Sequence, residues 1–216
     1  MFSLLLAVIY AAFISLGLPD ALLGSAWPTM YRVMNVPVSY AGIVSMIISC
    51  GTVISSLMSD RAVRRLGTHL VTVISVGLTA LGLFGFSSAG AFWQLCVWAV
   101  PYGLGAGSVD AALNNYIALY YRSGHMNWLH CFWGVGTIVS PFIMGYALTN
   151  RTWNSGYRII GFLQLAIAIL LLLTLPVWNI NKSATETAGK SVGLVGALKI
   201  KGVPFLLLGF FAYCAK

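Results

Sequence analysis

The feature that most constrains this chain is a succession of six long apolar segments, at about residues 4–30, 38–58, 68–88, 91–120, 127–149 and 156–178. A helix that crosses the hydrocarbon core of a bilayer needs roughly 20 mostly apolar residues. Hydrophobic residues make up 59% of the 216 and charged residues only 7%, which is too apolar for a surface in water. We therefore predict an all-α, polytopic membrane protein without a large soluble catalytic domain.

The net charge of +8 comes from Lys and Arg residues in the connections between these segments. Alternate connections are the basic ones, with Arg61, Arg64 and Arg65 after the second segment and Arg122 after the fourth. The positive-inside rule then predicts a multi-pass protein of the inner membrane with a cytoplasmic N-terminus. Basic residues in such loops do not indicate nucleic-acid binding.

The segments divide the chain into three parts. Residues 1–178 are predicted to form one six-helix transmembrane bundle, and the polar, small residues of 179–201 a cytoplasmic linker. The apolar run at 202–216 is predicted to begin a seventh helix and ends short of a full span. We expect a truncated copy, a fragment, or a half that pairs with another polypeptide.

Two short sequences recur along the bundle at similar offsets. The tetrad DALL that begins at Asp20 is echoed by DAAL at Asp110, and GTVISSLMS at Gly51 is echoed by GTIVSPFIM at Gly136. We predict that about residues 1–90 and 91–178 are repeats. Because each copy has an odd number of spans, the second enters the membrane from the other side, as in the inverted repeats that build transporter halves.

Two acids, Asp20 and Asp110, lie inside apolar segments. An ionised aspartate at bilayer depth costs about 2.5–3.5 kcal/mol on insertion scales, so it must be paired, solvated in a cavity or protonated. We predict that both face the bundle interior and take part in proton coupling. The alternative is that one of them caps a broken helix, as Pro19 before Asp20 indicates.

Asn114 lies one helical turn after Asp110, so the two side chains share a face that can bind hydroxyl groups of a polar solute. Aromatic rings can stack on sugars, and a histidine or glutamine inside a span can donate a hydrogen bond. Each also has an ordinary explanation as an interfacial, core or helix-packing residue. The predicted substrate-binding residues are Asp20, Trp27, Asp110, Asn114, His130, Trp133 and Gln164.

The connection SSLMSDRAVRRLG joins an acid at a helix end to a cluster of arginines. A positive-inside loop needs no aspartate. We predict that Asp60 pairs with Arg64 and receives the N-terminus of another helix. Together with Arg61 and Arg65, this pair would form a cytoplasmic latch that breaks when the protein changes state.

This connection resembles the signature between helices two and three of the major facilitator superfamily, although Ser56 replaces the leading glycine and the following glycine appears only at Gly67. Within that superfamily, Asp20, the segment GLGAGSVDAALNN around Asp110 and HCFWGVGTIVSP in the fifth span resemble the fucose permease group of sugar:proton symporters. The resemblance implies that both acids serve proton coupling and sugar binding, although the fourth-span acid is typically a glutamate. It also implies a twelve-helix carrier of which this chain is the first half.

We therefore expect a secondary active transporter that takes up a sugar or similar small polar solute with protons by alternating access. Its expected partners are the solute, the proton, the lipid bilayer and a second six-helix half, from the same gene or another chain. A non-transporting membrane fragment is the alternative. The sequence does not name the solute or separate symport from antiport.

An enzyme is the least favoured interpretation, because HExxH and GxSxG motifs are absent. The cysteines lie singly within apolar segments, without a CxxC pair or a histidine spacing that suits zinc. We expect no metal and no cofactor.

Overall fold

The computed structural model describes residues 2–178, 196 and 198–214, and the chain divides into two units, Met1–Trp178 and Asn179–Lys216. Within the described residues every regular element is a helix, which confirms the all-α prediction. In the second unit, α9 (Val203–Cys214) lies within the predicted start of a seventh helix. Most of the predicted linker, residues 179–195 and 197, lies outside the described residues.

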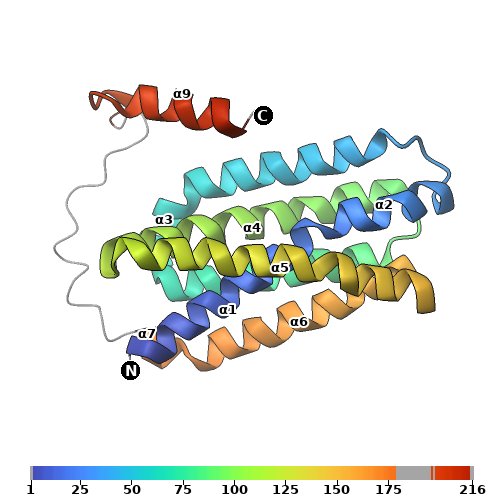
Figure 1. Ribbon diagram of the computed structural model, residues 1–216, viewed down its shortest axis with the longest axis horizontal. Helices are drawn as coiled ribbons and strands as arrows, with labels where there is room; N and C mark the ends of the chain where they lie inside the picture. The colour runs from blue at the N-terminus through green and yellow to red at the C-terminus, as the bar shows by residue number, and fades with distance from the viewer. Residues whose placement is uncertain (1, 179–195, 197, 215–216) are drawn as a thin grey trace. The chain divides into compact units, whose positions relative to one another are not determined.

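The first unit is a bundle of long helices that lie side by side (Figure 1). Its elements in chain order are α1 (Phe2–Asp20), α2 (Leu22–Val33), α3 (Tyr40–Ser88), α4 (Phe92–Tyr120), α5 (Ser123–Asn150), α6 (Trp153–Leu173) and α7 (Leu175–Trp178). Among the described residues, four stretches are long and apolar enough to cross a membrane: Leu4–Val33, Tyr40–Ser88, Ser123–Asn150 and Trp153–Leu173. Helix α4 is long enough but less apolar, because it carries polar side chains such as Gln94, Asp110 and Asn114.

Helix α3 contains two of the predicted spans, joined at a break. Gly67 has φ +81° and ψ 155°, a left-handed backbone conformation that glycine adopts without steric cost. Residues on either side of the break lie against adjacent residues of α4, Ile48 against Gly103 and Gly82 against Tyr102. In one straight helix Ile48 and Gly82 would be roughly 50 Å apart. The chain therefore turns back at Gly67, and α3 supplies two of the six passages of the bundle (Figure 1).

Close backbone crossings support the predicted repeat. Gly17 in α1 and Gly107 in α4 each lie three residues before the aspartate of their segment. A Cβ on Gly17 would lie against the backbone of Trp133 and Thr137 in α5, and a Cβ on Gly107 against the backbone of Thr52 in α3. Both threonines belong to the echoed GT sequences. The crossing of α1 with α5 therefore resembles the crossing of α4 with the first part of α3. In both, a glycine three residues before the aspartate meets the backbone of the helix that carries the GT sequence.

Two clusters of buried apolar side chains fill opposite ends of the bundle. Along α1 the change from one cluster to the other falls between Leu16 and Leu18, and along α4 it falls between Tyr102 and Val109. Asp20 and the residues that approach it lie near this change. The polar site therefore occupies the middle of the bundle, where the apolar core is interrupted.

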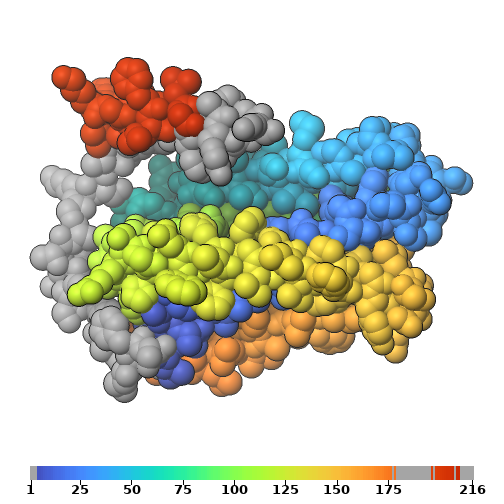
Figure 2. Space-filling model, in the orientation of Figure 1, coloured from blue at the N-terminus to red at the C-terminus, as the bar shows by residue number. Residues whose placement is uncertain are grey.

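Helix α5 lies along one face of the bundle (Figure 2). Its outer side carries large exposed apolar side chains, among them Trp128, Ile138, Phe142 and Tyr146. Only a narrow stripe, including Leu129, Gly136 and Met144, is buried. Such a face suits lipid or another apolar surface and not water.

Candidate functional site

Asp20 lies at a break between two helices. Helix α1 ends at Asp20, with Pro19 in its last turn, and α2 begins at Leu22 after Ala21. Ala21 is the residue that caps α2, and no side chain caps that helix by a hydrogen bond. Asp20 therefore does not cap α2, which was the alternative interpretation of this residue.

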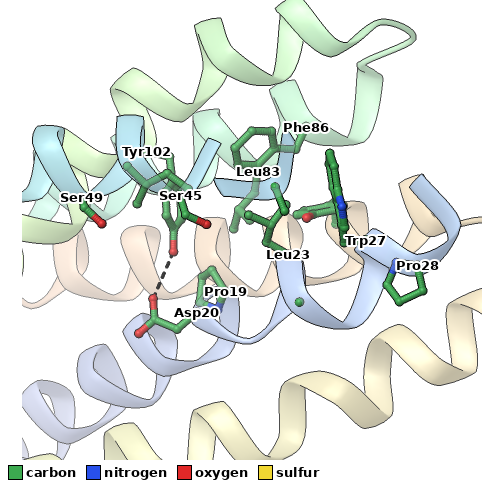
Figure 3. A pocket seen from close by; sticks show the side chains of 14 residues that line it. Pro19, Asp20, Leu23, Trp27, Pro28, Ser45, Ser49, Leu83, Phe86 and Tyr102 are labelled. Carbon is green, nitrogen blue, oxygen red and sulfur yellow. Dashed lines mark hydrogen bonds between the residues drawn. The ribbon is translucent and has the colours of Figure 1, made fainter. Parts of the chain in front are cut away.

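The carboxylate of Asp20 instead accepts hydrogen bonds from two other helices. The indole Nε1 of Trp133 in α5 donates to Oδ2 at 2.8 Å. The hydroxyl of Tyr102 in α4 donates to Oδ1 at 3.3 Å (Figure 3). Hydrogen bonds to an ionised carboxylate are stronger than those between neutral groups. Asp20 thus links α1 to both α4 and α5, and its side chain remains exposed to the cavities around it.

The second acid, Asp110, forms the predicted polar pair with Asn114. The amide Nδ2 of Asn114 donates to Oδ1 of Asp110 at 3.0 Å, one helical turn away on α4. Within the described part of the chain, the buried Oδ1 of Asn114 accepts no hydrogen bond. The pair therefore keeps acceptor capacity for a further donor.

A cavity of about 330 Å³ brings the two acids together. It lies between α1, α3, α4 and α5, and its wall includes Asp20, Asp110, Thr52, Tyr102, His130 and Trp133. Carboxylates, a histidine and an indole thus face one space. Convergent polar groups in a cavity of this size are typical of a small-molecule site.

A larger cavity, of about 430 Å³, lies on the other side of Asp20. Its wall comes from α1, α2, α3, α4 and α6 and includes Trp27, Ser45, Ser49, Leu83, Phe86 and Tyr157. Asp20, Ile48 and Tyr102 line both cavities. These three residues therefore form the wall that the two spaces share.

Neither of the two cavities is lined by a lysine or an arginine, as judged on the residues that the structure describes. The charges that face them are the carboxylates of Asp20 and Asp110. Such an arrangement attracts protons, cations and hydroxyl donors, and repels anions.

The structure places four of the predicted substrate-binding residues, Asp20, Asp110, His130 and Trp133, on the smaller cavity. Trp27 lines the larger one. Its indole Nε1 donates to the carbonyl of Val38 at 2.7 Å, so only the ring face remains for a ligand. The role of these residues in binding stays a prediction.

The remaining glutamine lies elsewhere. Gln164 in α6 is fully buried and donates through Nε2 to the hydroxyl of Thr79 in α3 at 2.7 Å. It lines neither cavity. The geometry favours the helix-packing interpretation of Gln164 over the ligand interpretation.

Sequence reasoning did not select two tyrosines that line the larger cavity, Tyr102 and Tyr157. Tyr157 lies at the start of its predicted segment, where tyrosines are common in interfacial belts. Tyr102 is one of several aromatic residues near the predicted site, and its type and position do not set it apart from the others. For Tyr157 we find no sequence signal that would have singled it out.

The predicted latch contains an ion pair. Arg64 Nη2 lies 2.7 Å from Oδ2 of Asp60, one turn apart on α3, and both side chains are about half exposed. Arg61 and Arg65 are also exposed. An exposed pair of this spacing contributes about 0.3–0.5 kcal/mol to stability, so its role as a latch stays a prediction.

Comparison with known proteins gives a family match over almost the whole chain. The sequence model of the Major Facilitator Superfamily matches residues 7–215. One similar protein is Bypass of stop codon protein 6 of Saccharomyces cerevisiae, which is 26% identical over 165 residues that cover 74% of this chain and 33% of that protein. Another is the Cis,cis-muconate transport protein of Acinetobacter baylyi, which is 24% identical over 165 residues that cover 73% and 40%. The chain thus spans less than half the length of the curated relatives it matches.

A solved structure of similar fold is the crystal structure of a D-xylose-proton symporter. The two superpose with a TM-score of 0.64 at 14% sequence identity, over 84% of this chain and 52% of that one. The arrangement of helices is therefore that of about half of such a protein. The narrower resemblance to fucose permeases stays a prediction.

Proposed function

The chain belongs to the major facilitator superfamily, and from that premise we propose that it is one half of a proton-coupled carrier that takes up a sugar or similar small polar solute. Membership of this family makes it a transporter and not an enzyme. The observation that carries the proposal is the smaller cavity, in which Asp20 and Asp110 face one space between α1, α4 and α5.

Proton coupling is supported by the two different donors on Asp20. An indole nitrogen only donates, whereas a phenol both donates and accepts. A proton on Oδ2 would oppose the Trp133 N–H, while a proton on Oδ1 can be donated to the Tyr102 oxygen after that hydroxyl rotates. We propose that Oδ1 is the oxygen that gains and loses the proton, and that the bond to Trp133 persists throughout.

A neutral hydroxylated solute is supported by the charges of the cavity. Hydroxyl groups can donate to the carboxylates of Asp20 and Asp110, and the indole face of Trp133 offers an apolar surface beside them. An anionic solute would meet the same charges unfavourably. We therefore place the substrate among polyols and not among dicarboxylates, unlike the relative that is named for muconate.

Alternating access requires a second six-helix half, which we propose closes the site from the other side. The bias of basic connections supports an N-terminus in the cytoplasm of an inner membrane, with the Asp60–Arg64 pair on that side. A second candidate is a membrane fragment that does not transport. The small share of each curated relative that the chain covers favours keeping this candidate.

The test is solute-driven proton entry into liposomes that contain this half together with a second half. A pH-sensitive dye inside the liposomes reports acidification when monosaccharides, beginning with D-xylose, are added outside. We expect Asp20→Asn and Asp110→Asn to reduce solute-driven acidification at least a hundredfold, because each removes a group that binds a proton.

Exchange of labelled solute at equal concentrations on both sides is the control, since it needs no net proton movement. The variants should keep at least part of this exchange. Unchanged acidification in the Asp110→Asn variant would contradict a role of Asp110 in proton coupling. Full acidification by the 216-residue chain alone would remove the need for a second half.

A further inference from the structure

A nearly fully buried tyrosine, Tyr157, lines the larger cavity. Tyr157 in α6 is only 2% exposed, and its hydroxyl makes no hydrogen bond within the described part of the chain. Its ring is held in place by Phe86, at a centroid distance of 5.4 Å, and by Trp153, at 6.1 Å. A buried hydroxyl that lacks a partner is unfavourable. The hydroxyl has almost no surface that a water-sized molecule could touch, so Tyr157 contributes its apolar ring and not its hydroxyl to the cavity wall.

Polar and apolar side chains are segregated along this cavity (Figure 3). Ser45, Ser49, Tyr102 and Asp20 lie toward one end. Leu23, Leu83, Phe86, Trp27 and Pro28 lie toward the other. A ligand that fills the cavity must therefore offer hydroxyl groups at one end and an apolar group at the other.

Phe86 packs against both tyrosines that line this cavity. Its ring lies 6.0 Å from that of Tyr102 and 5.4 Å from that of Tyr157, measured between centroids. One apolar side chain thus packs against both phenols that line the space. The aromatic rings are held in place by packing, so a ligand that binds against them causes little loss of side-chain freedom.

We propose that the larger cavity is a subsite for an apolar substituent, in which Asp20, Ser45 and Ser49 bind the hydroxyl groups of the solute and Leu23, Trp27 and Leu83 hold the substituent. The proposal rests on the proposed function, because the polar end of the subsite is the Asp20 that would bind the proton. It identifies the preferred solutes as hydroxylated molecules with an aromatic or alkyl group, such as aryl glycosides, and places free sugars second.

The test compares paired probes that differ only in the substituent. Methyl and phenyl glycosides of D-xylose, D-glucose, D-galactose and L-fucose are titrated against the 216-residue chain in lipid nanodiscs, which avoids glycoside detergents. Tryptophan fluorescence reports binding, because Trp27 lines the cavity. All residues of the subsite come from this chain, so for at least one sugar the phenyl glycoside should bind about ten times more tightly than the methyl glycoside.

Three variants test which side chains produce the preference for phenyl over methyl glycosides. Tyr157→Phe keeps the ring on the cavity wall and removes only the inaccessible hydroxyl, so it should leave phenyl glycoside binding unchanged and the thermal unfolding temperature unchanged or higher. Leu23→Ser should bring the affinities of the phenyl and methyl glycosides close together. Tyr146→Phe is the matched control, since Tyr146 is 62% exposed on α5 and lines neither cavity.

Two results would contradict the proposed subsite. One is equal binding, or no binding, of the phenyl and methyl members of every pair. The other is a Leu23→Ser variant that keeps the full preference for phenyl glycosides, although its side chain lines the apolar end of the cavity. Solute-driven acidification by free sugars would then still support the proposed function. Tight phenyl glycoside binding without any solute-driven acidification would contradict the proposed function alone.

Discussion

The two cavities on either side of Asp20 share a wall but differ in chemistry. The smaller one gathers the charged and titratable groups Asp20, Asp110 and His130. The larger one, apart from Asp20 itself, is made of uncharged side chains. The difference separates a site suited to moving a proton from a site suited to recognising a shape.

The largest effect is expected from a substitution that disrupts the helix crossing beside the smaller cavity. In Gly17→Ala the new methyl group would meet the backbone of α5, so overpacking should cost about 3 kcal/mol of stability. Gly145→Ala is the matched control, because nothing lies within 4 Å of its new Cβ. Alanine is the better helix former by up to about 1 kcal/mol, so the control should be slightly stabilised. Thermal unfolding in nanodiscs measures both, and a stabilised Gly17→Ala variant would contradict the close crossing.

A smaller effect should separate the two cavities directly. Trp133→Phe keeps an aromatic ring in the smaller cavity but removes the donor to Oδ2 of Asp20. Loss of a hydrogen bond to a charged group should lower solute-driven acidification about tenfold or more. The ratio of phenyl to methyl glycoside affinity should not change, since it is set on the other side of Asp20. Trp128→Phe, on the exposed side of α5, should change neither quantity.

The smallest effect concerns a buried polar pair outside both cavities. Thr79→Val leaves Gln164 without its partner and should cost about 1 kcal/mol of stability, whereas Thr79→Val combined with Gln164→Leu should be nearly neutral. A double-mutant cycle in thermal unfolding measures this coupling. Solute affinity should stay the same in the double variant. A large loss of solute affinity would mean that Gln164 takes part in binding after all.

Much of the smaller cavity could be predicted from the sequence because its residues carry charge or hydrogen-bonding groups in apolar surroundings. Asp20 and Asp110 are conspicuous for that reason, and the break at Gly67 falls between two spans that the apolar pattern already separates. The family resemblance pointed to the same acids.

What the sequence did not determine is the direction in which each side chain points. Gln164 looked like a site residue, yet it faces α3, because helix α6 is apolar on nearly every side and its polar residue does not mark a face. Tyr157 lies two turns earlier on the same helix and lines a cavity. Only the packing of α6 against its neighbours distinguishes these two positions.

The crossing of Gly17 and Gly136 also determines how far different parts of α5 can travel. Each glycine meets the backbone of the other helix, so the two axes approach there more closely than side chains would allow. This point is near the middle of α5, a helix of 28 residues. A tilt of 10° about it would move each end by roughly 4 Å, given a rise of about 1.5 Å per residue. Trp133, less than one turn from the fulcrum, would shift by under about 1 Å. The same small rotation can therefore widen the bundle at the membrane surface while the hydrogen bond to Asp20 stays intact.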